Sequence, residues 1–94
     1  MTMAPVQDNK ERNRYELRLA DDIAFINYRR ANGIVTLLHA EVPARHSGRG
    51  IGSAMVKGAL EQVRADGERV LPLCSFVAAY IDRHAEVQDL LARK

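Results

Sequence analysis

The sequence predicts an α+β fold in which an antiparallel meander of three strands precedes a long helix, a parallel fourth strand and one or two C-terminal helices. Three observations support this fold class. Apolar and polar residues alternate over stretches in the first half of the chain, which is typical of half-buried strands. From residue 51 the spacing changes to that of an amphipathic helix. A short apolar stretch and a further helical pattern then follow.

The 94 residues, 47% hydrophobic and 28% charged, are enough for one domain with one core. Residues 1–12 show no clear period, and we expect them to form a flexible N-terminal tail before a domain over residues 13–94. The single cysteine, Cys74, excludes an intramolecular disulfide and is typical of a reducing compartment. No stretch has the pattern of a signal peptide or a membrane span, so we expect a cytoplasmic protein without a membrane partner.

Two short turns separate the three predicted strands. Asn32-Gly33 is the stronger turn signal, because both central residues of a type I′ turn have positive φ. Asp21-Asp22 predicts the other two-residue turn. Pro43 removes a backbone donor and therefore ends the third strand.

Two-residue turns also predict the register, and paired residues share a face of the sheet. Tyr28 is expected opposite Leu37, Ile26 opposite His39, and Tyr15 opposite Tyr28. One face then carries a hydrophobic set with one titratable group near its end: Tyr15, Leu17, Leu19, Ile26, Tyr28, Val35, Leu37 and His39.

A helix is predicted over residues 51–65, with Gly67 as its C-terminal cap. Its apolar stripe consists of Ile51, Met55, Val56, Ala59, Leu60 and Val63. Residues 70–73 form the fourth strand, which should run parallel to the third because a helical crossover joins them. Helical patterns over residues 76–84 and about 86–93 complete the chain.

The segment Arg45-His46-Ser47-Gly48-Arg49-Gly50-Ile51-Gly52 carries the clearest chemical signal. It places alternating glycines directly before a helix, whose first N–H groups have no helical partner and whose dipole attracts anions. The glycines allow a phosphate to approach the backbone, and Arg45 and Arg49 add cationic donors. We predict a phosphate-binding loop; a loop that needs only flexibility is the alternative.

The first six residues of this segment resemble the Arg/Gln-x-x-Gly-x-Gly/Ala motif of the GNAT acetyltransferase superfamily. Residues 39–43 and 71–81 are similar to a compact, single-domain subgroup, so the resemblance covers about residues 14–86. The chain departs from this subgroup at Ser75 and Ala85, where proline is common. The resemblance implies a minimal GNAT-like fold, and we expect it to lack the N-terminal helices and last two strands that usually shape the acceptor pocket.

The resemblance further implies acetyl-CoA or coenzyme A as the cofactor. We expect no metal site, because the sequence has no C-x-x-C motif or His/Cys cluster. Loop amides would hold the pyrophosphate, the end of the third strand would lie beside the pantetheine arm, and the thioester would enter where the third and fourth strands diverge. The residues implied at the cofactor are Val42, Arg45, Ser47, Gly48, Arg49, Gly50, Ile51, Gly52 and Ser53.

Acetyl transfer needs a neutral amine and an acid for the leaving thiolate. His39 is the candidate base, because imidazole titrates in the required range; the alternative is a partly buried structural histidine. Cys74, directly after the fourth strand, is either a nucleophile that carries the acetyl group or a small residue that lines the pocket. By resemblance Tyr80 is the candidate acid, and otherwise a core aromatic residue.

We therefore predict an N-acetyltransferase that acts on a primary amine of a small molecule or a protein. The alternative is a coenzyme A-binding module that is inactive alone. The net charge of +2 and the few aromatic residues give little support for binding nucleic acid. We expect a monomer or a weak homodimer.

Overall fold

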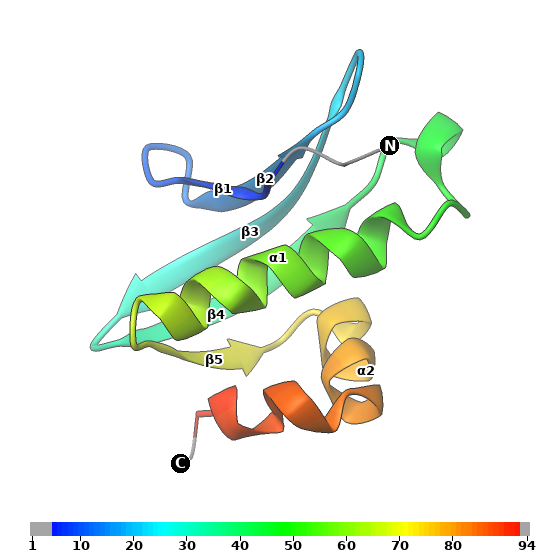
Figure 1. Cartoon of the computed structure of the whole chain (residues 1–94). Coiled ribbons are helices and arrows are strands. Elements are labelled where there is room, and N and C mark those ends of the chain that lie inside the picture. Colours follow the sequence, from blue (N-terminus) through cyan, green and yellow to red (C-terminus); the bar gives the residue numbers. More distant parts are fainter. Residues whose placement is uncertain (1–4, 93–94) are drawn as a thin grey trace.

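The computed structural model describes residues 5–92, which form one five-stranded sheet with its helices packed on one side. The elements are β1 (Gln7–Asn9), β2 (Arg14–Arg18), β3 (Ile23–Ala31), β4 (Ile34–Glu41), η1 (Ala44–His46), α1 (Ile51–Ala65), β5 (Arg69–Pro72), α2 (Ser75–Arg83) and η2 (Ala85–Leu90) (Figure 1). The strands are ordered as in the chain, with β1 to β4 antiparallel and β5 parallel to β4. This arrangement confirms the predicted α+β fold class.

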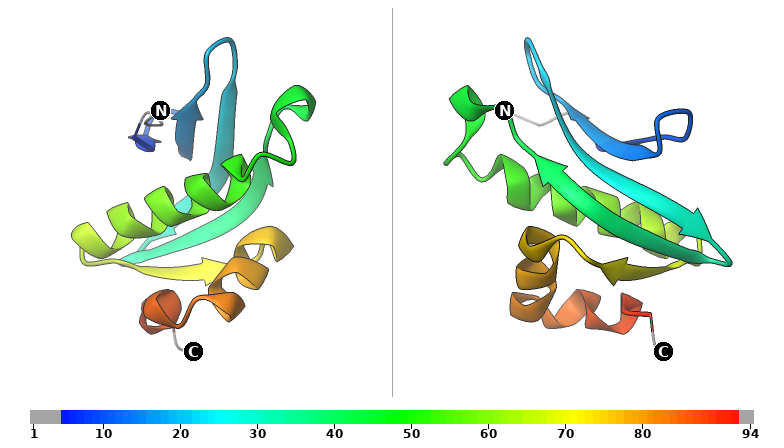
Figure 2. Two further views of the ribbon diagram at one scale, coloured as in Figure 1. Left: turned by 45° about the vertical axis from the view of Figure 1, so that its right-hand side comes forward. Right: turned by 180° about the vertical axis from the view of Figure 1, so that it is seen from behind.

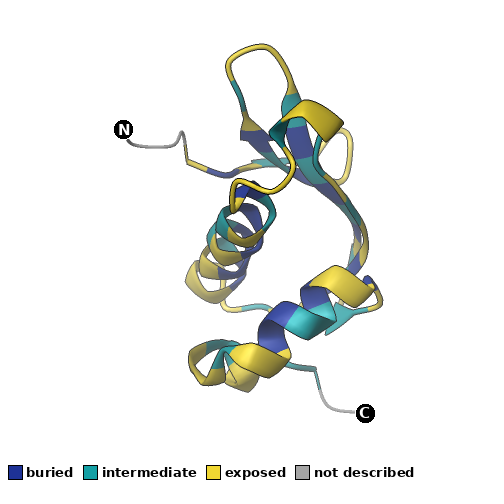
Figure 3. Ribbon diagram, turned by 90° about the vertical axis from the view of Figure 1, so that its right-hand side faces the viewer, coloured by how far each residue is buried: buried dark blue, intermediate teal, exposed yellow. Residues whose placement is uncertain are grey.

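The sheet curves around α1, which lies along its inner face, while α2 and η2 lie beside β5 (Figure 2). The rear view in Figure 2 shows no described helix over the outer face of the sheet. Buried residues gather where α1 faces the sheet (Figure 3). The six residues of the predicted apolar stripe of α1 are all buried, which confirms that stripe. Among the helices of residues 5–92, none is long and apolar enough to span a membrane.

The two predicted turns differ in outcome. The Asn32-Gly33 turn is confirmed, with φ of 54° and 76°. The other turn spans four residues rather than two, because β2 and β3 pair only up to Arg18 and Ile23, and the N–H of Leu19 donates to the Asp22 carbonyl at 2.8 Å. The resulting register shift is even, so each side chain keeps its predicted face.

The pairing of β3 with β4 contains a bulge that the sequence did not predict. Tyr28 pairs with Leu37 as expected, but the next pair joins Asn27 to His39. Leu38 is therefore an extra residue on β4, and the alternation of faces changes beyond it. The prediction that His39 lies on the buried face was wrong, since His39 lies on the outer face instead.

Residues 5–12, which we expected in a flexible tail, include β1. This strand pairs with β2 from Gln7 opposite Glu16 to Asn9 opposite Arg14. Before it, Val6 is buried, and its carbonyl accepts a hydrogen bond from the Gln62 side chain of α1. A strand of three polar residues shows no alternating pattern, so periodicity could not reveal it. The rest of the predicted tail, residues 1–4, lies outside the described residues.

A polar network joins β1 to β3 and to the turn before β5. Arg30 donates to Asp8 at 3.1 Å, to Glu68 at 2.9 Å and to the Tyr28 hydroxyl at 2.9 Å. The Tyr28 hydroxyl in turn donates to Asp8. Burial, together with this hydrogen bond to Asp8, raises the pKa of Tyr28 to about 12. The network therefore ties the N-terminal strand to the domain.

The C-terminal half follows the predicted pattern closely. α1 ends at Ala65, Gly67 follows the C-cap with φ of 70°, and the N–H of Glu68 donates to the Val63 carbonyl at 3.0 Å, which is a Schellman cap. α2 matches the helix predicted over residues 76–84 within one residue at each end. The last predicted helix is a 3₁₀ helix, η2, after which Leu91 bridges to Val70 of β5. Residues 93 and 94 lie outside the described residues.

We predict that Gly58→Ala destabilises the protein through Val6. A Cβ at position 58 would lie 2.5 Å from Val6 Cγ2 and 2.9 Å from Val6 Cβ. Overpacking of this kind costs about 1–3 kcal/mol, against a gain of about 1 kcal/mol in helix propensity. In a Val6→Ala background the cost of Gly58→Ala should fall by about 1 kcal/mol or more, because the closest clashing atom, Val6 Cγ2, is gone. Urea unfolding of the four proteins measures this coupling, and strictly additive effects would contradict the packing of Val6 on α1.

Candidate functional site

The glycine loop lies between the end of β4 and the start of α1. It begins with η1, where the Ser47 hydroxyl and N–H donate to the Ala44 carbonyl at 2.8 and 3.2 Å. Gly48 and Gly50 follow with φ of 79° and 75°. This left-handed conformation costs other residues about 1–2 kcal/mol, so the loop requires glycine at these two positions.

The first turn of α1 presents backbone amides that the described chain does not use. Gly50 is the N-cap and makes no side-chain cap, and its carbonyl accepts the N–H of Ala54 at 3.0 Å. Within residues 5–92, no protein acceptor is found for the N–H groups of Ile51, Gly52 and Ser53. Unpaired amides at the positive end of a helix dipole form a site for an anion.

Gly52 has a different role from the other two glycines. A Cβ at this position would lie 2.8 Å from Cζ of Phe76. Gly52 therefore allows the first turn of α2 to pack closely against the first turn of α1. In the sequence, the position of this glycine predicts only the approach of a phosphate, and nothing in the local pattern indicates its contact with Phe76.

A cavity of about 420 Å³ opens beside these amides. Its wall includes most of the residues implied at the cofactor: Val42, Ser47, Gly48, Gly50, Ile51, Gly52 and Ser53. Ala40, His46, Met55 and Phe76 complete it, and these were not predicted as cofactor residues. Phe76 comes from α2, so only the packing of two helices could place it here. Arg45 and Arg49, which were predicted at the cofactor, do not line the cavity.

Arg45 is instead paired with Asp21 in the connection between β2 and β3. The guanidinium lies 2.8 Å from one oxygen of Asp21, and Nε2 of His46 lies 3.2 Å from the other. The hydrogen bond with His46, reinforced by the charge of Arg45, holds the pKa of the Asp21 carboxyl below its usual range. The sequence predicts Asp21 only as a turn residue, whereas in the structure its carboxylate contacts two residues of η1.

β4 and β5 diverge after Leu37. Their pairing ends with Leu37 opposite Pro72, and the Leu37 carbonyl then accepts the N–H groups of both Leu73 and Cys74, at 2.9 and 3.0 Å. Beyond this point β4 continues along β3, while the chain after β5 turns into α2. The predicted divergence of the third and fourth strands is therefore present, and we call it the strand split.

Two of the three candidate catalytic residues lie at the strand split, on different sides of it. Cys74 is 8% exposed and forms the N-cap of α2. His39 follows Leu37 by two residues, and its side chain is 61% exposed, with Nε2 3.4 Å from Glu41 Oε1. The structure thus brings Cys74 to the inside of the split and His39 to its surface. Because His39 is exposed, it is not the partly buried structural histidine that the sequence left as the alternative.

Tyr80, the third candidate, lies elsewhere. It is buried, stacks on His84 with ring centroids 3.8 Å apart, and lines a groove between α1 and η2 rather than the cavity at the glycine loop. Burial, and then the charges of Glu86 and Glu61, raise the pKa of Tyr80. Its role as an acid stays a prediction, and this position is also that of a core aromatic residue.

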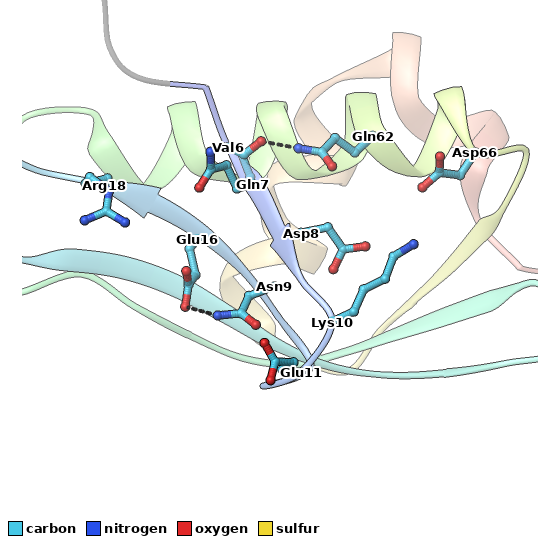
Figure 4. A pocket seen from close by; sticks show the side chains of 10 residues that line it. All are labelled: Val6, Gln7, Asp8, Asn9, Lys10, Glu11, Glu16, Arg18, Gln62 and Asp66. Carbon is cyan, nitrogen blue, oxygen red and sulfur yellow. Dashed lines mark hydrogen bonds between the residues drawn. The ribbon is translucent and has the colours of Figure 1, made fainter.

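A larger hollow of about 770 Å³ lies along β1 and the adjacent part of α1 (Figure 4). Its wall is polar and charged, and Glu16 there already accepts hydrogen bonds from Asn9 and Arg14. None of the predicted site residues lines this hollow. We place the candidate site at the glycine loop, where unpaired amides and an adjoining cavity occur together.

A mixed sheet whose two parallel strands diverge beside a glycine-rich helix start defines the GNAT-like class of folds. Residues 14–90 match the GCN5-related N-acetyl-transferase family, and the chain belongs to this family. Its structure resembles the solution NMR structure of a GCN5-like protein from Staphylococcus aureus, presented as a candidate N-acetyltransferase. The TM-score is 0.72 at 21% identity, over 100% of this chain and 93% of the other, which shows a shared fold. A comparison with curated proteins found no match.

We predict that Asp21→Asn loosens the glycine loop without unfolding the domain. The substitution removes the charge that holds Arg45 and His46, so amide hydrogen exchange over residues 45–50 should become faster. Asp22→Asn is the matched control, because the Asp22 carboxylate contacts only the N–H of Ile23 next to it. Equal exchange rates in the two variants would contradict this role of Asp21.

The same contact predicts a pH dependence. Folding lowers the pKa of Asp21. Its carboxylate therefore stabilises the loop fully above the unfolded-state pKa of about 3.9, and this stabilisation is lost as the pH falls through the folded-state pKa. Protection of the loop in the wild-type protein should therefore decline only in strong acid. Protection that is already lost near neutral pH would show that another group controls the loop.

Proposed function

We propose that this protein is an acetyl-CoA-dependent N-acetyltransferase that acts on a primary amine. The observation that carries the proposal is the row of amides at Ile51, Gly52 and Ser53 that are unpaired within the described chain, beside a cavity that is also lined by Ala40 of β4 and Phe76 of α2. Membership of the GCN5-related N-acetyltransferase family supports acetyl transfer as the reaction.

The residues around the cavity suit coenzyme A. The unpaired amides of the first turn would hold the diphosphate, and the space above Gly48 and Gly50 is open, with no atom within 4 Å of a Cβ built at either position. Val42, Met55 and Phe76 form an apolar wall suited to the pantetheine arm. When bound, acetyl-CoA supplies an acetyl group activated as a thioester.

The chain's own groups would then handle the acceptor. Direct attack forms a bond between the amine nitrogen and the acetyl carbon, breaks the bond from that carbon to sulfur, and releases one proton from nitrogen. His39 would take this proton, and Glu41, whose Oε1 lies 3.4 Å from Nε2 of His39, would orient the imidazole. The leaving thiolate is protonated from water or from the protein. Cys74 would line the inner side of the split.

A coenzyme A-binding module that is inactive alone is the second candidate function. The exposure of the His39 side chain favours it, because an open surface excludes little water from a reacting amine. Tyr80 also lies away from the cavity. Thiol release tied to an acetylated product, measured across a panel of amines and peptides, separates the two candidates.

We predict that Gly50→Ala weakens acetyl-CoA binding far more than Gly67→Ala. Both glycines have left-handed φ, 75° and 70°, and open space around them, so each substitution should cost about 1–2 kcal/mol of stability. Only Gly50 borders the cavity. Titration calorimetry with acetyl-CoA compares the variants, and thermal unfolding checks that their stabilities match. Equal affinity in both variants would place the cofactor elsewhere.

We predict that His39→Ala lowers kcat/KM by about a hundredfold or more, the usual contribution of a general base, whereas Cys74→Ala keeps most of the turnover. This difference follows from direct attack on the thioester. Intact-mass spectrometry after incubation with acetyl-CoA provides the second measurement. An acetyl group carried by Cys74 and then passed to an added amine would establish the covalent route instead.

A further inference from the structure

Apolar side chains gather on the surface at the strand split. Three large hydrophobic residues of the described chain are exposed: Leu38 at 37%, Leu73 at 63% and Phe76 at 41%. All three lie within a few residues of Leu37 or of Cys74, where β4 and β5 diverge. Phe76 lines the cavity, so its exposure belongs to the site already described. Leu38 and Leu73 do not line that cavity and need another explanation.

Register places both leucines on the outer face of the sheet. Leu37 is fully buried on the inner face, and Pro72 is its partner on β5. Successive side chains of a strand point to opposite faces. Leu38 follows Leu37 on β4, Leu73 directly follows β5, and both are exposed, as expected for side chains that point outward. The N–H of Leu73 donates to the carbonyl of Leu37, the residue before Leu38, so the two leucines lie on neighbouring chain segments at the point where the strands separate.

The bulge at Leu38 adds two polar side chains to the same surface. His39 pairs with Asn27, and Glu41 pairs with Phe25, so both lie on the outer face with their side chains 3.4 Å apart. We call Leu38, His39, Glu41 and Leu73 the outer patch. Val42 and Met55, in contrast, border the cavity on the inner side, where α1 lies. The strand split separates the cavity from the outer patch.

We propose that the outer patch binds the acceptor, and that this acceptor is a polypeptide whose primary amine lies next to an apolar residue. The inference rests on the proposed function. A thioester held from the inner side reaches the split, and an amine that approaches from the outer face meets it beside His39. The two leucines then contact the apolar neighbour, while the Glu41 carboxylate attracts the ammonium form of the amine.

The openness of the outer patch favours a polypeptide over a small molecule. Small ligands usually bind in cavities that bury most of their surface. The side chains of Leu73, His39 and Glu41 are each about 60% exposed or more, so the patch is an open surface rather than a pocket. An extended chain can make enough contacts across such a surface, and the adjoining cavity shares no residue with the patch.

The test compares two short peptides with blocked N-termini and a single free lysine, flanked by leucine in one and by serine in the other. With wild-type protein and acetyl-CoA we expect kcat/KM to be about tenfold higher for the leucine-flanked peptide. This factor is at the lower end of what contacts with an apolar substrate group usually contribute to discrimination between substrates. Leu38→Ser and Leu73→Ser should each reduce this preference without changing the affinity for acetyl-CoA. Lys57→Ser, an exposed change on α1 at the opposite face of the sheet, should leave the preference intact.

The outcomes distinguish this inference from the proposed function. Acetylation of both peptides at equal rates, or a clear preference for small apolar amines, overturns the inference while the acetyltransferase stands. Absence of acetylation for every amine tested overturns both. Analytical ultracentrifugation tests whether a second copy of the chain occupies the outer patch. A dimer that dissociates in the Leu73→Ser variant would assign the outer patch to self-association.

Discussion

The hydrogen bonds to the carbonyl of Leu37 decide the layout of the site. This one acceptor takes the last two N–H groups that β5 and its continuation offer to β4, and the strands then part. β4 keeps its pairing with β3 and carries His39 and Glu41 forward, while the other chain turns at Cys74 into α2. The split exists because a helix begins where the parallel ladder would otherwise continue. The cavity and the outer patch both take their positions from it.

The second requirement is close packing of α1, which aims its N-terminus at the cavity. Two glycines on this helix serve as contact points, Gly52 beneath Phe76 of α2 and Gly58 beneath Val6 before β1. The helix is therefore held along its length by elements from both ends of the chain. Because Gly50 provides no side-chain cap, the first amides stay unpaired within the described chain. Rigid packing and an incomplete cap together convert an ordinary helix start into an anion site.

The bulge at Leu38 positions His39, whereas the contact of Asp21 with η1 positions the glycine loop. Without the extra residue at Leu38, His39 would point inward beneath α1; with it, the imidazole stands beside Glu41 on the outer face. Asp21 meanwhile reaches from a distant turn to hold Arg45 and His46. The residue proposed to face the acceptor and the loop proposed to bind the cofactor are thus positioned by different contacts, which can be altered independently.

The sequence by itself determined the class of fold, the apolar stripe of α1 and the Asn32-Gly33 turn, because each depends on periodicity or turn chemistry within a few neighbouring residues. Most of the cavity wall was indicated by the resemblance of the glycine motif to a known family. Tertiary structure alone decided the rest. The bulge at Leu38 is hidden in a continuous apolar run, β1 is too short to show a period, and the contacts of Asp21 with Arg45 and of Gly52 with Phe76 join distant segments. A local pattern reports which face of an element is apolar, whereas register and long-range contacts also depend on the partner element.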